Sequence, residues 1–501
     1  MTQTRLPERQ AREVLLVRAI ESEDADAAVL TREDRQFATG AALSERPLGE
    51  REDGREIARF LHRRSELALE RLLSRFPNLR RACGLSRWPA WLNWAVPLVA
   101  LVAGFLSHRL DGDRLNILAF PLLGMLLWNL AVYAWLLIGA LRRGAGRRSD
   151  VVGHPLLRLL ERLGQPAVAR LAAQPTLERG VTRFTRDWSR AAGALTRYRA
   201  SRTLHLGAAL FAAGVIAGLL IRARYTAEYQ AGWAGTWAGA EGEIAAFLQL
   251  VLGPASWLTG IALPDAEQLR ALRGGGENAG DWLLLWAVTA VLFVIGPRLL
   301  LAAWNASRAA VLKRRVPVPG ADDFYVRLLL RNALGRPGLA RVVPYGFQPS
   351  AVARERLERL LGTALGDKIR VTIDESVPYG AEDRWLAAQG AELGRADQLV
   401  LLYGMASTPE AENHGAFARG VREALVGGGT ALTLLIDDSS FRERLRGQPS
   451  ADRRLDDRLA AWREVLAPVG TAPVVIGLEL GEDEVSARTL EKALMRSPVP
   501  A

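Results

Sequence analysis

Two pairs of neighbouring acidic residues are the side chains in this sequence that are best arranged for chemistry. The pairs at 374–375 and 437–438 each follow a short apolar run that predicts a buried strand. Carboxylate oxygens at strand ends can hold a hard cation such as magnesium. A structural role competes with this one, because Ser440 stands three residues before Glu443 in the pattern of a helix capping box. We favour the capping role, and we predict no metal and no other cofactor.

The sequence lacks the residues that other kinds of catalytic site require. Cys83 is the single cysteine, which excludes a thiolate metal site, and only three of the 65 basic residues are lysine, with none in a phosphate-binding loop. Neither a dinucleotide-binding glycine motif nor a nucleophile elbow is present. His414 falls inside a predicted helix without a nucleophile beside it. The sequence therefore predicts a protein that is not an enzyme.

The same strand ends carry residues that are typical of interaction surfaces. Tyr345, Tyr403 and Met405 are expected at the rim of the sheet, close to Asp374 and Asp437. Tyrosine and methionine beside charge are enriched where proteins bind one another. We take these five residues as the candidate partner-docking site. The alternative is that the two tyrosines cover the top of the sheet core.

The elements that must position these residues form a C-terminal α/β domain at 316–501. Short apolar runs alternate with amphipathic helical patterns, which predicts a doubly wound, mainly parallel sheet of about five strands. The expected strands are 341–347, 368–373, 398–403, 431–436 and 473–478. The expected helices are 351–365, 381–393, 410–425 and 441–466. Ligands of such sheets bind beyond the carboxyl ends of the strands.

The middle of the chain is apolar enough to cross a membrane. The region 88–141 holds two uncharged stretches, and 203–221 and 282–304 add a third and a fourth. Each approaches the roughly 20 residues that a spanning helix needs. Arg298 interrupts the fourth stretch, and we expect its side chain to extend to the lipid headgroups. The sequence thus predicts an α-helical membrane domain with four transmembrane helices.

Charge decides the orientation of these helices. The loop 142–202 holds 14 arginines against four acids, whereas 222–281 holds four arginines against seven acids. Positively charged loops stay on the cytoplasmic side. We therefore predict a multi-pass protein of the bacterial inner membrane with both termini in the cytoplasm. The apolar stretch 244–263 is then an external helix or hairpin that lies on or dips into the outer face.

The remaining segments complete the domain organisation. Residues 1–87 read as a cytoplasmic region with two amphipathic helical stretches, 8–35 and 50–76, whose apolar face needs a partner. The arginine-rich loop 142–202 is the expected partner, and its charge favours contact with membrane lipids over nucleic acid. Gly214 and Gly218 lie four residues apart, so another helix, within one subunit or in a homo-oligomer, can approach closely.

Several short stretches resemble a bacterial inner-membrane family that is catalogued only as a domain of unknown function. They are LVRAIE, GWAGTW, GPRLLL, DDSSF and DRLAAW, at 16–21, 232–237, 296–301, 437–441 and 457–462. Genes of that family often lie beside one for an Era-like GTPase. The resemblance therefore implies a cytoplasmic GTPase as a partner and carries over no catalytic residue.

Three functions remain open from the sequence. The first, which we favour, is a non-enzymatic inner-membrane scaffold or sensor whose α/β domain docks a partner protein. The second is a metal-dependent enzyme that acts at the acidic strand-end loops. The third is an oligomeric channel or mechanosensitive pore, which would need polar residues along one face of a span; such residues are sparse.

Overall fold

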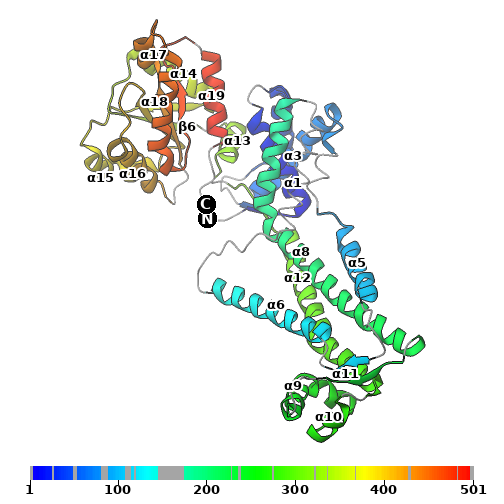
Figure 1. Ribbon diagram of the computed structural model, residues 1–501. Helices are drawn as coiled ribbons and strands as arrows, with labels where there is room; N and C mark the ends of the chain where they lie inside the picture. The colour runs from blue at the N-terminus through cyan, green and yellow to red at the C-terminus, as the bar shows by residue number, and fades with distance from the viewer. Residues whose placement is uncertain are drawn as a thin grey trace. The chain divides into compact units, whose positions relative to one another are not determined.

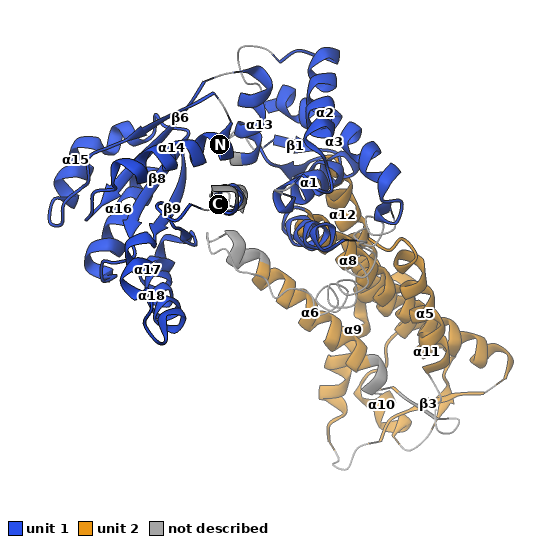
Figure 2. Cartoon of the chain, turned by 90° about the horizontal axis from the view of Figure 1, so that it is seen from above, with its two compact units in different colours: residues 1–86, 165–191, 315–501 blue, residues 87–164, 192–314 orange. Residues whose placement is uncertain are grey.

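The computed structural model groups the chain into two compact units (Figure 2). Unit 1 comprises residues 1–86, 165–191 and 315–501, and unit 2 comprises 87–164 and 192–314. The residues that the structure describes are 4–24, 27–48, 54–80, 88–107, 114–117, 120–144, 174–226, 228–234, 239–273, 276–320, 323–335, 337–366, 368–426, 430–481 and 483–496. Cys83 and the 145–173 part of the arginine-rich loop lie outside these residues.

Unit 2 is built from the apolar helices that the sequence predicts. Helix α5 is Leu92–Ser107, and α6 is Phe120–Gly144. Helix α8, Pro175–Tyr225, extends over 51 residues and belongs partly to each unit. Helix α11, Gly280–Ala290, continues through a π-helix, η1 (Val291–Ile295), into α12, Gly296–Lys313 (Figure 1).

Two of the four predicted spans are long and apolar enough to cross a membrane. These are α8 and the combined helix 280–313; α5 and residues 123–139 of α6 are shorter apolar helices. The prediction of four spans is therefore supported in part, by two helices of crossing length among the described residues. Most of the exposed large apolar side chains of the chain also lie in unit 2, including Trp94, Trp128 and Leu300, which are 64%, 70% and 72% exposed.

Glycines allow α5 and α8 to pack closely. A Cβ atom added at Gly214 would overlap the carbonyl oxygen of Leu101, and one at Gly104 would overlap the carbonyl oxygen of Phe211. At Gly218 the added atom would lie 2.7 Å from the carbonyl oxygen of Phe105. The predicted glycine face is confirmed, and the helix that it receives belongs to the same chain.

A small subdomain follows α8 in unit 2. Its three-stranded sheet has the order β2-β3-β4, formed by Arg114–Asn116, Gln230–Gly232 and Glu277–Asn278. Helices α9 (Glu241–Thr259) and α10 (Ala266–Leu272) complete it. The predicted apolar stretch 244–263 is thus one helix, not a hairpin, and it ends where Gly260 adopts a φ of 75°. The sheet was not predicted, because its strands are only two or three residues long.

Three helices begin unit 1. They are α1 (Glu8–Glu23), α2 (Arg32–Glu45) and α3 (Gly54–Arg75). The predicted stretch 8–35 is divided because the Asp24 carboxylate accepts hydrogen bonds from the backbone N–H groups of Ala28, Val29 and Leu30. These bonds stop α1 and form the turn that leads to α2.

Part of the arginine-rich segment packs against these helices, as predicted. Gly180 of α8 lies against Ile20 of α1, where an added Cβ would be 2.9 Å from the Ile20 Cα. Arg18 donates to Asp187 at 3.4 Å, and Arg183 donates to Glu23 at 3.3 Å. The prediction is confirmed for residues 175–191 of that segment.

Strand β1 (Thr4–Leu6) pairs antiparallel with β5 (Val316–Val318). Helix α13, Phe324–Leu334, follows β5 and meets the N-terminal helices through buried charges. The Arg64 guanidinium donates to both carboxylate oxygens of Glu21, at 2.9 and 3.2 Å, and to the Tyr325 hydroxyl at 3.0 Å. The Tyr325 hydroxyl donates to Glu21 at 2.6 Å, and Arg18 donates to Asp323 at 2.8 Å.

The C-terminal part of unit 1 is a five-stranded parallel sheet, as predicted. Its order is β10-β9-β8-β6-β7, so the first strand in sequence lies between the second and the third. The strands are Gly338–Tyr345, Ile369–Ile373, Gln398–Gly404, Ala431–Asp437 and Val474–Ile476, from β6 to β10.

Helices cover both faces of this sheet. Helices α14 (Ala351–Leu365) and α19 (Asp483–Arg496) pack on one core cluster. Helices α15 (Glu382–Leu393), α16 (Ala416–Ala424) and α18 (Ala451–Leu466) pack on the other (Figure 1). The predicted helix 441–466 is two helices, α17 (Ser439–Leu445) and α18, and α19 was not predicted. A short helix, η3 (Ala467–Val469), follows α18.

We expect the Glu21–Arg64 pair to control the stability of unit 1. Burial alone would raise the pKa of Glu21, but the charges of Arg64 and Arg35 outweigh it and lower that pKa. A lowered carboxyl pKa contributes stability above its unfolded value, and this contribution is lost as pH falls through the folded pKa. Arg64→Met leaves a buried carboxylate unpaired and should cost about 3–5 kcal/mol at neutral pH.

Thermal unfolding of the full-length protein between pH 5 and 8 tests this expectation. The loss of unfolding free energy caused by Arg64→Met should become smaller as the pH falls, because protonation neutralises Glu21 in the variant. Glu21→Gln combined with Arg64→Met should recover part of the loss. A deficit that is independent of pH would contradict the role of the Glu21 charge.

Candidate functional site

The predicted site residues all lie at the carboxyl edge of the five-stranded sheet. Tyr345 ends β6, Tyr403 and Met405 lie at the end of β8, Asp437 ends β9, and Asp374 follows β7. Strands β6 and β8 are neighbours in the sheet, but the chain continues from them to opposite faces. The helix after β6, α14, covers one face, and the helix after β8, α16, covers the other. Ligands of doubly wound sheets bind at such a switch point.

The three apolar members of the predicted docking site are buried. Tyr345, Tyr403 and Met405 are exposed by 1%, 0% and 0%. The Tyr345 ring stacks on Phe417 with 4.7 Å between centroids and meets Tyr403 edge-on at 5.9 Å. The expectation that these side chains form an exposed rim is therefore corrected: they cover the top of the sheet core, which is the alternative that the sequence left open. A partner cannot touch them in this conformation.

The hydroxyl groups of the two tyrosines have different surroundings. The Tyr345 hydroxyl donates a short hydrogen bond to the Glu382 carboxylate. Burial raises the pKa of Tyr345, and the neighbouring Glu382 charge raises it further. The Tyr403 hydroxyl and the Trp462 indole N–H are buried without a hydrogen-bond partner among the described residues. Burial also raises the pKa of Tyr403.

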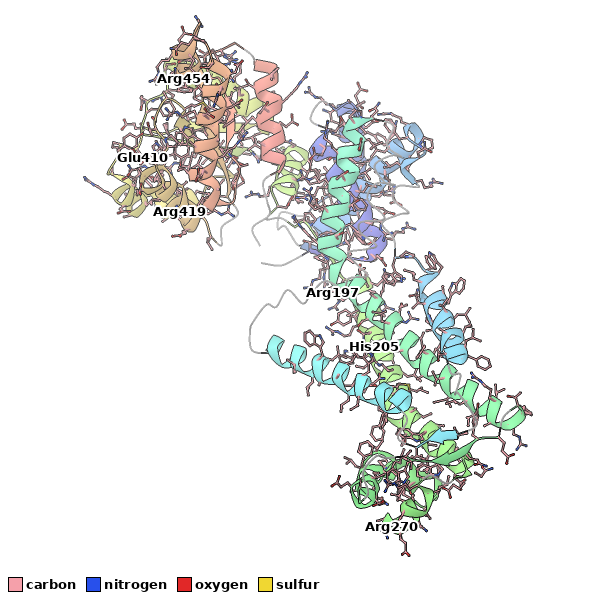
Figure 3. All side chains as sticks on the ribbon, in the orientation of Figure 1. Arg197, His205, Arg270, Glu410, Arg419 and Arg454 are labelled. Atoms are coloured by element: carbon pink, nitrogen blue, oxygen red, sulfur yellow. The ribbon has the colours of Figure 1, made fainter. Side chains whose placement is uncertain are left out.

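His414 connects this buried cluster to the surface. It lies in a π-helix, η2 (Ala411–Gly415), where the sequence predicted a regular helix. The backbone N–H of Glu410 (labelled in Figure 3) donates to His414 Nδ1 at 3.3 Å, and His414 Nε2 lies 3.1 Å from the Tyr379 hydroxyl. Because Nδ1 accepts, Nε2 must carry the proton and donate to Tyr379. Burial lowers the pKa of His414.

This arrangement offers little to a reaction. Both ring nitrogens of His414 are engaged, so the imidazole is not poised to accept a proton from a substrate. Tyr379 is the exposed member of the cluster, with 48% of its surface accessible. Sequence reasoning placed His414 in a helix and missed its bond to Tyr379, because the two residues are 35 positions apart.

The two acidic pairs do not converge. Asp374 is bound by Arg341, whose Nε and Nη2 donate at 2.8 and 2.7 Å. Asp437 lies three strands away in the order β9-β8-β6-β7, which is about 14 Å at the usual strand spacing. Within the described part of the chain, no group of three or more His, Cys, Asp or Glu side chains could hold a metal ion.

Asp437 has a structural role, although not through the capping box that was predicted. Its carboxylate accepts hydrogen bonds from Ser439 N, Ser439 Oγ and Leu478 N, at 3.1, 2.6 and 3.1 Å. It thereby joins the start of α17 to the chain that leaves β10. Helix α17 begins at Ser439, one residue before the expected cap, and Asp438 makes no side-chain cap. Burial raises the pKa of Asp437, and the neighbouring Asp438 charge raises it further.

The apolar residues that are exposed at this edge of the sheet differ from the predicted ones. Val352 in the first turn of α14, Leu480 after β10 and Val485 in the first turn of α19 are 64%, 40% and 59% exposed. The Ser350 hydroxyl, two residues before Val352, donates to the carboxylate of Glu479, which directly precedes Leu480, so the two loops meet at this edge. We call these three residues the rim patch. Sequence reasoning missed Val485, because α19 was not predicted.

Comparison with known proteins assigns no family to the chain and no function to this site. No known protein family matches the chain, and no curated protein is similar to it.

The two tyrosines provide a matched test of the buried cluster. Tyr403→Phe removes a hydroxyl that has no partner, so the free energy of unfolding should stay equal or rise by up to about 1 kcal/mol. Tyr345→Phe removes the hydrogen bond to Glu382 and should lower the free energy of unfolding by about 1–2 kcal/mol. Thermal unfolding of the full-length variants measures both. A destabilised Tyr403→Phe would mean that its hydroxyl is bonded in solution.

Proposed function

We propose that this chain is a non-enzymatic inner-membrane scaffold or sensor whose α/β domain docks a cytoplasmic protein. The rim patch carries the docking part of the proposal. It is apolar and exposed, whereas the polar residues at the same edge are used in internal bonds: Asp374 with Arg341, Asp437 with Ser439, and Tyr345 with Glu382. An exposed apolar group on a domain of this kind favours a protein partner over chemistry. The resemblance to the inner-membrane family suggests an Era-like GTPase as that partner.

Four spans complete the membrane part of the proposal. They are α5, α6, the part of α8 in unit 2, and α11 with η1 and α12. Helix α5 alone rises about 24 Å over its 16 residues, and the uncharged residues 88–91 before it make up the difference to a bilayer core of about 30 Å. The excess of arginine in 142–202 supports a cytoplasmic location for that loop and for both termini.

A pair of topology reporters tests the membrane arrangement. A reporter that is active only in the cytoplasm should work after Ala501. A reporter that is active only outside should work when inserted in the loop between α9 and α10. Activity of the cytoplasmic reporter at the α9–α10 loop would contradict the four-span arrangement.

Substitutions in the rim patch test docking. Val352→Asp with Leu480→Asp puts two charges on the patch, and Asp at position 352 also suits the first turn of a helix. The double variant should weaken recovery of the cytoplasmic partner from native membranes by tenfold or more. Val426→Asp is the control, since Val426 is 77% exposed and precedes β9, at the opposite edge of the sheet. Equal recovery with the double variant and the control would remove the docking role from the patch.

A further inference from the structure

Arg298 is a buried cation in one of the two helices that are long and apolar enough to cross a membrane. It belongs to α12, and only 7% of its surface is exposed. The sequence led us to expect a side chain extended to lipid headgroups, and the structure instead turns it into unit 2. Arginine stays charged in proteins, so its burial is costly unless it is compensated.

Neutral groups from two other helices contact this guanidinium. Its Nε donates to the Asn129 side-chain oxygen of α6 at 2.7 Å, and its Nη1 lies 3.1 Å from His205 Nδ1 of α8. Figure 3 labels His205 on α8. The ring of Tyr133, also from α6, lies 5.4 Å from the guanidinium carbon. Because arginine only donates, His205 Nδ1 must accept, and the histidine is neutral in this arrangement.

The π-helix η1 explains why Arg298 faces inward. A π-helix adds one residue to a turn, which shifts every following side chain around the helix axis. The buried residues of α11, η1 and α12 recur at Trp286, Ala290, Val294, Arg298 and Ala302, four positions apart. In a regular helix this spacing would drift away from one face. The extra residue of η1 offsets most of this drift and keeps Arg298 on the interior face.

Proline and tyrosine hold this distortion in place. Pro297 has no N–H, so the carbonyl of Phe293 lacks its usual helical donor. The Tyr133 hydroxyl donates to that carbonyl at 3.1 Å. Helix α6 therefore contacts the distorted segment twice, through Tyr133 and through Asn129, which lie four residues apart on one face.

Two further donors lie on the same interior face. The Trp286 side chain is 3% exposed and the Thr289 side chain is 0% exposed, and neither the indole N–H nor the hydroxyl has a hydrogen-bond partner among the described residues. Arg298 follows Thr289 by about 13 Å along the helix. At that distance these donors do not contact a small anion bound at Arg298, so the site rests on the buried guanidinium.

No carboxylate of the described residues balances the charge of Arg298. Over the described residues, no carboxylate forms an ion pair with Arg298, whereas the buried arginines of unit 1 at positions 18 and 64 each have one. We propose that the interior face of α11–α12 is a binding site for an anionic group, centred on Arg298. The shared chemistry is a phosphate or a comparable small anion, which a guanidinium binds through charge-assisted hydrogen bonds. Two sources can supply it: a free anion or the headgroup of an anionic lipid.

The test uses the purified full-length protein in uncharged detergent. Inorganic phosphate and chloride are titrated in one arm against gluconate at equal ionic strength, and phosphatidylglycerol against phosphatidylcholine in the other. Ligand binding to the folded state raises the melting temperature in a saturable way. We expect such a rise in at least one arm, and the arm that responds identifies the source.

Two variants decide whether Arg298 is the site. Arg298→Gln should weaken the apparent affinity at least tenfold. Arg308→Gln, an exposed arginine on the same helix, should leave it unchanged. Where Arg298→Gln does not fold, Arg298→Lys keeps the charge and should respond more weakly than the wild type. An absence of any saturable rise in the wild type, or an equal rise in the Arg298 variants, would overturn the proposal.

Discussion

A buried arginine must have a partner, and this requirement organises unit 1. The chain uses arginine for nearly all of its positive charge, and an arginine does not lose its proton when it is buried. Arg64 on α3 and Arg18 on α1 are therefore bound by Glu21 and Asp323. Because Tyr325 joins the Glu21 pair, these bonds fix α1 and α3 to a helix about 300 positions later in the sequence. The strand pair β1–β5 brings the same segments together through the backbone.

Unit 2 meets a different constraint with different contacts. Its helices are apolar, and two of the helical segments are long enough to cross a membrane. Helices that lie in lipid gain little from burying apolar surface against one another. Close backbone approach provides the attraction instead, as where Gly104 of α5 meets Gly214 of α8. Polar contacts add to this at the distorted helix, where the Tyr133 hydroxyl donates to the carbonyl that Pro297 leaves without a donor, and between α5 and α8, where Arg222 donates to the carbonyl oxygen of Phe105. Among the described residues of unit 2, the buried cation Arg298 lies beside this distortion, which ties its position to the same proline.

The sequence predicts the sheet well and its rim poorly, for physical reasons. Strands β6 to β10 are short apolar runs, and α14 ends where its pattern ends, so periodicity alone locates them. Tyr345 and Tyr403 were expected to be exposed because they stand next to turn residues. Tyr345 is nevertheless the last residue of β6 and Tyr403 the next-to-last residue of β8, and helices cover both faces of these strands. Both side-chain directions of such a strand point into a core. The π-helices η1 and η2 have no composition signal, since each is one extra residue within an otherwise regular helix.

Helix α8 connects these two sets of constraints. At about 77 Å for 51 residues, it is far longer than a bilayer core requires. Its first part is held in unit 1 by the contact of Gly180 with Ile20 and by the bond from Arg18 to Asp187. Its second part is held in unit 2 by Gly214, and it carries His205 to the Arg298 site. One continuous helix therefore follows two packing rules: charged side chains pair over residues 175–191, and backbones approach closely over residues 192–225.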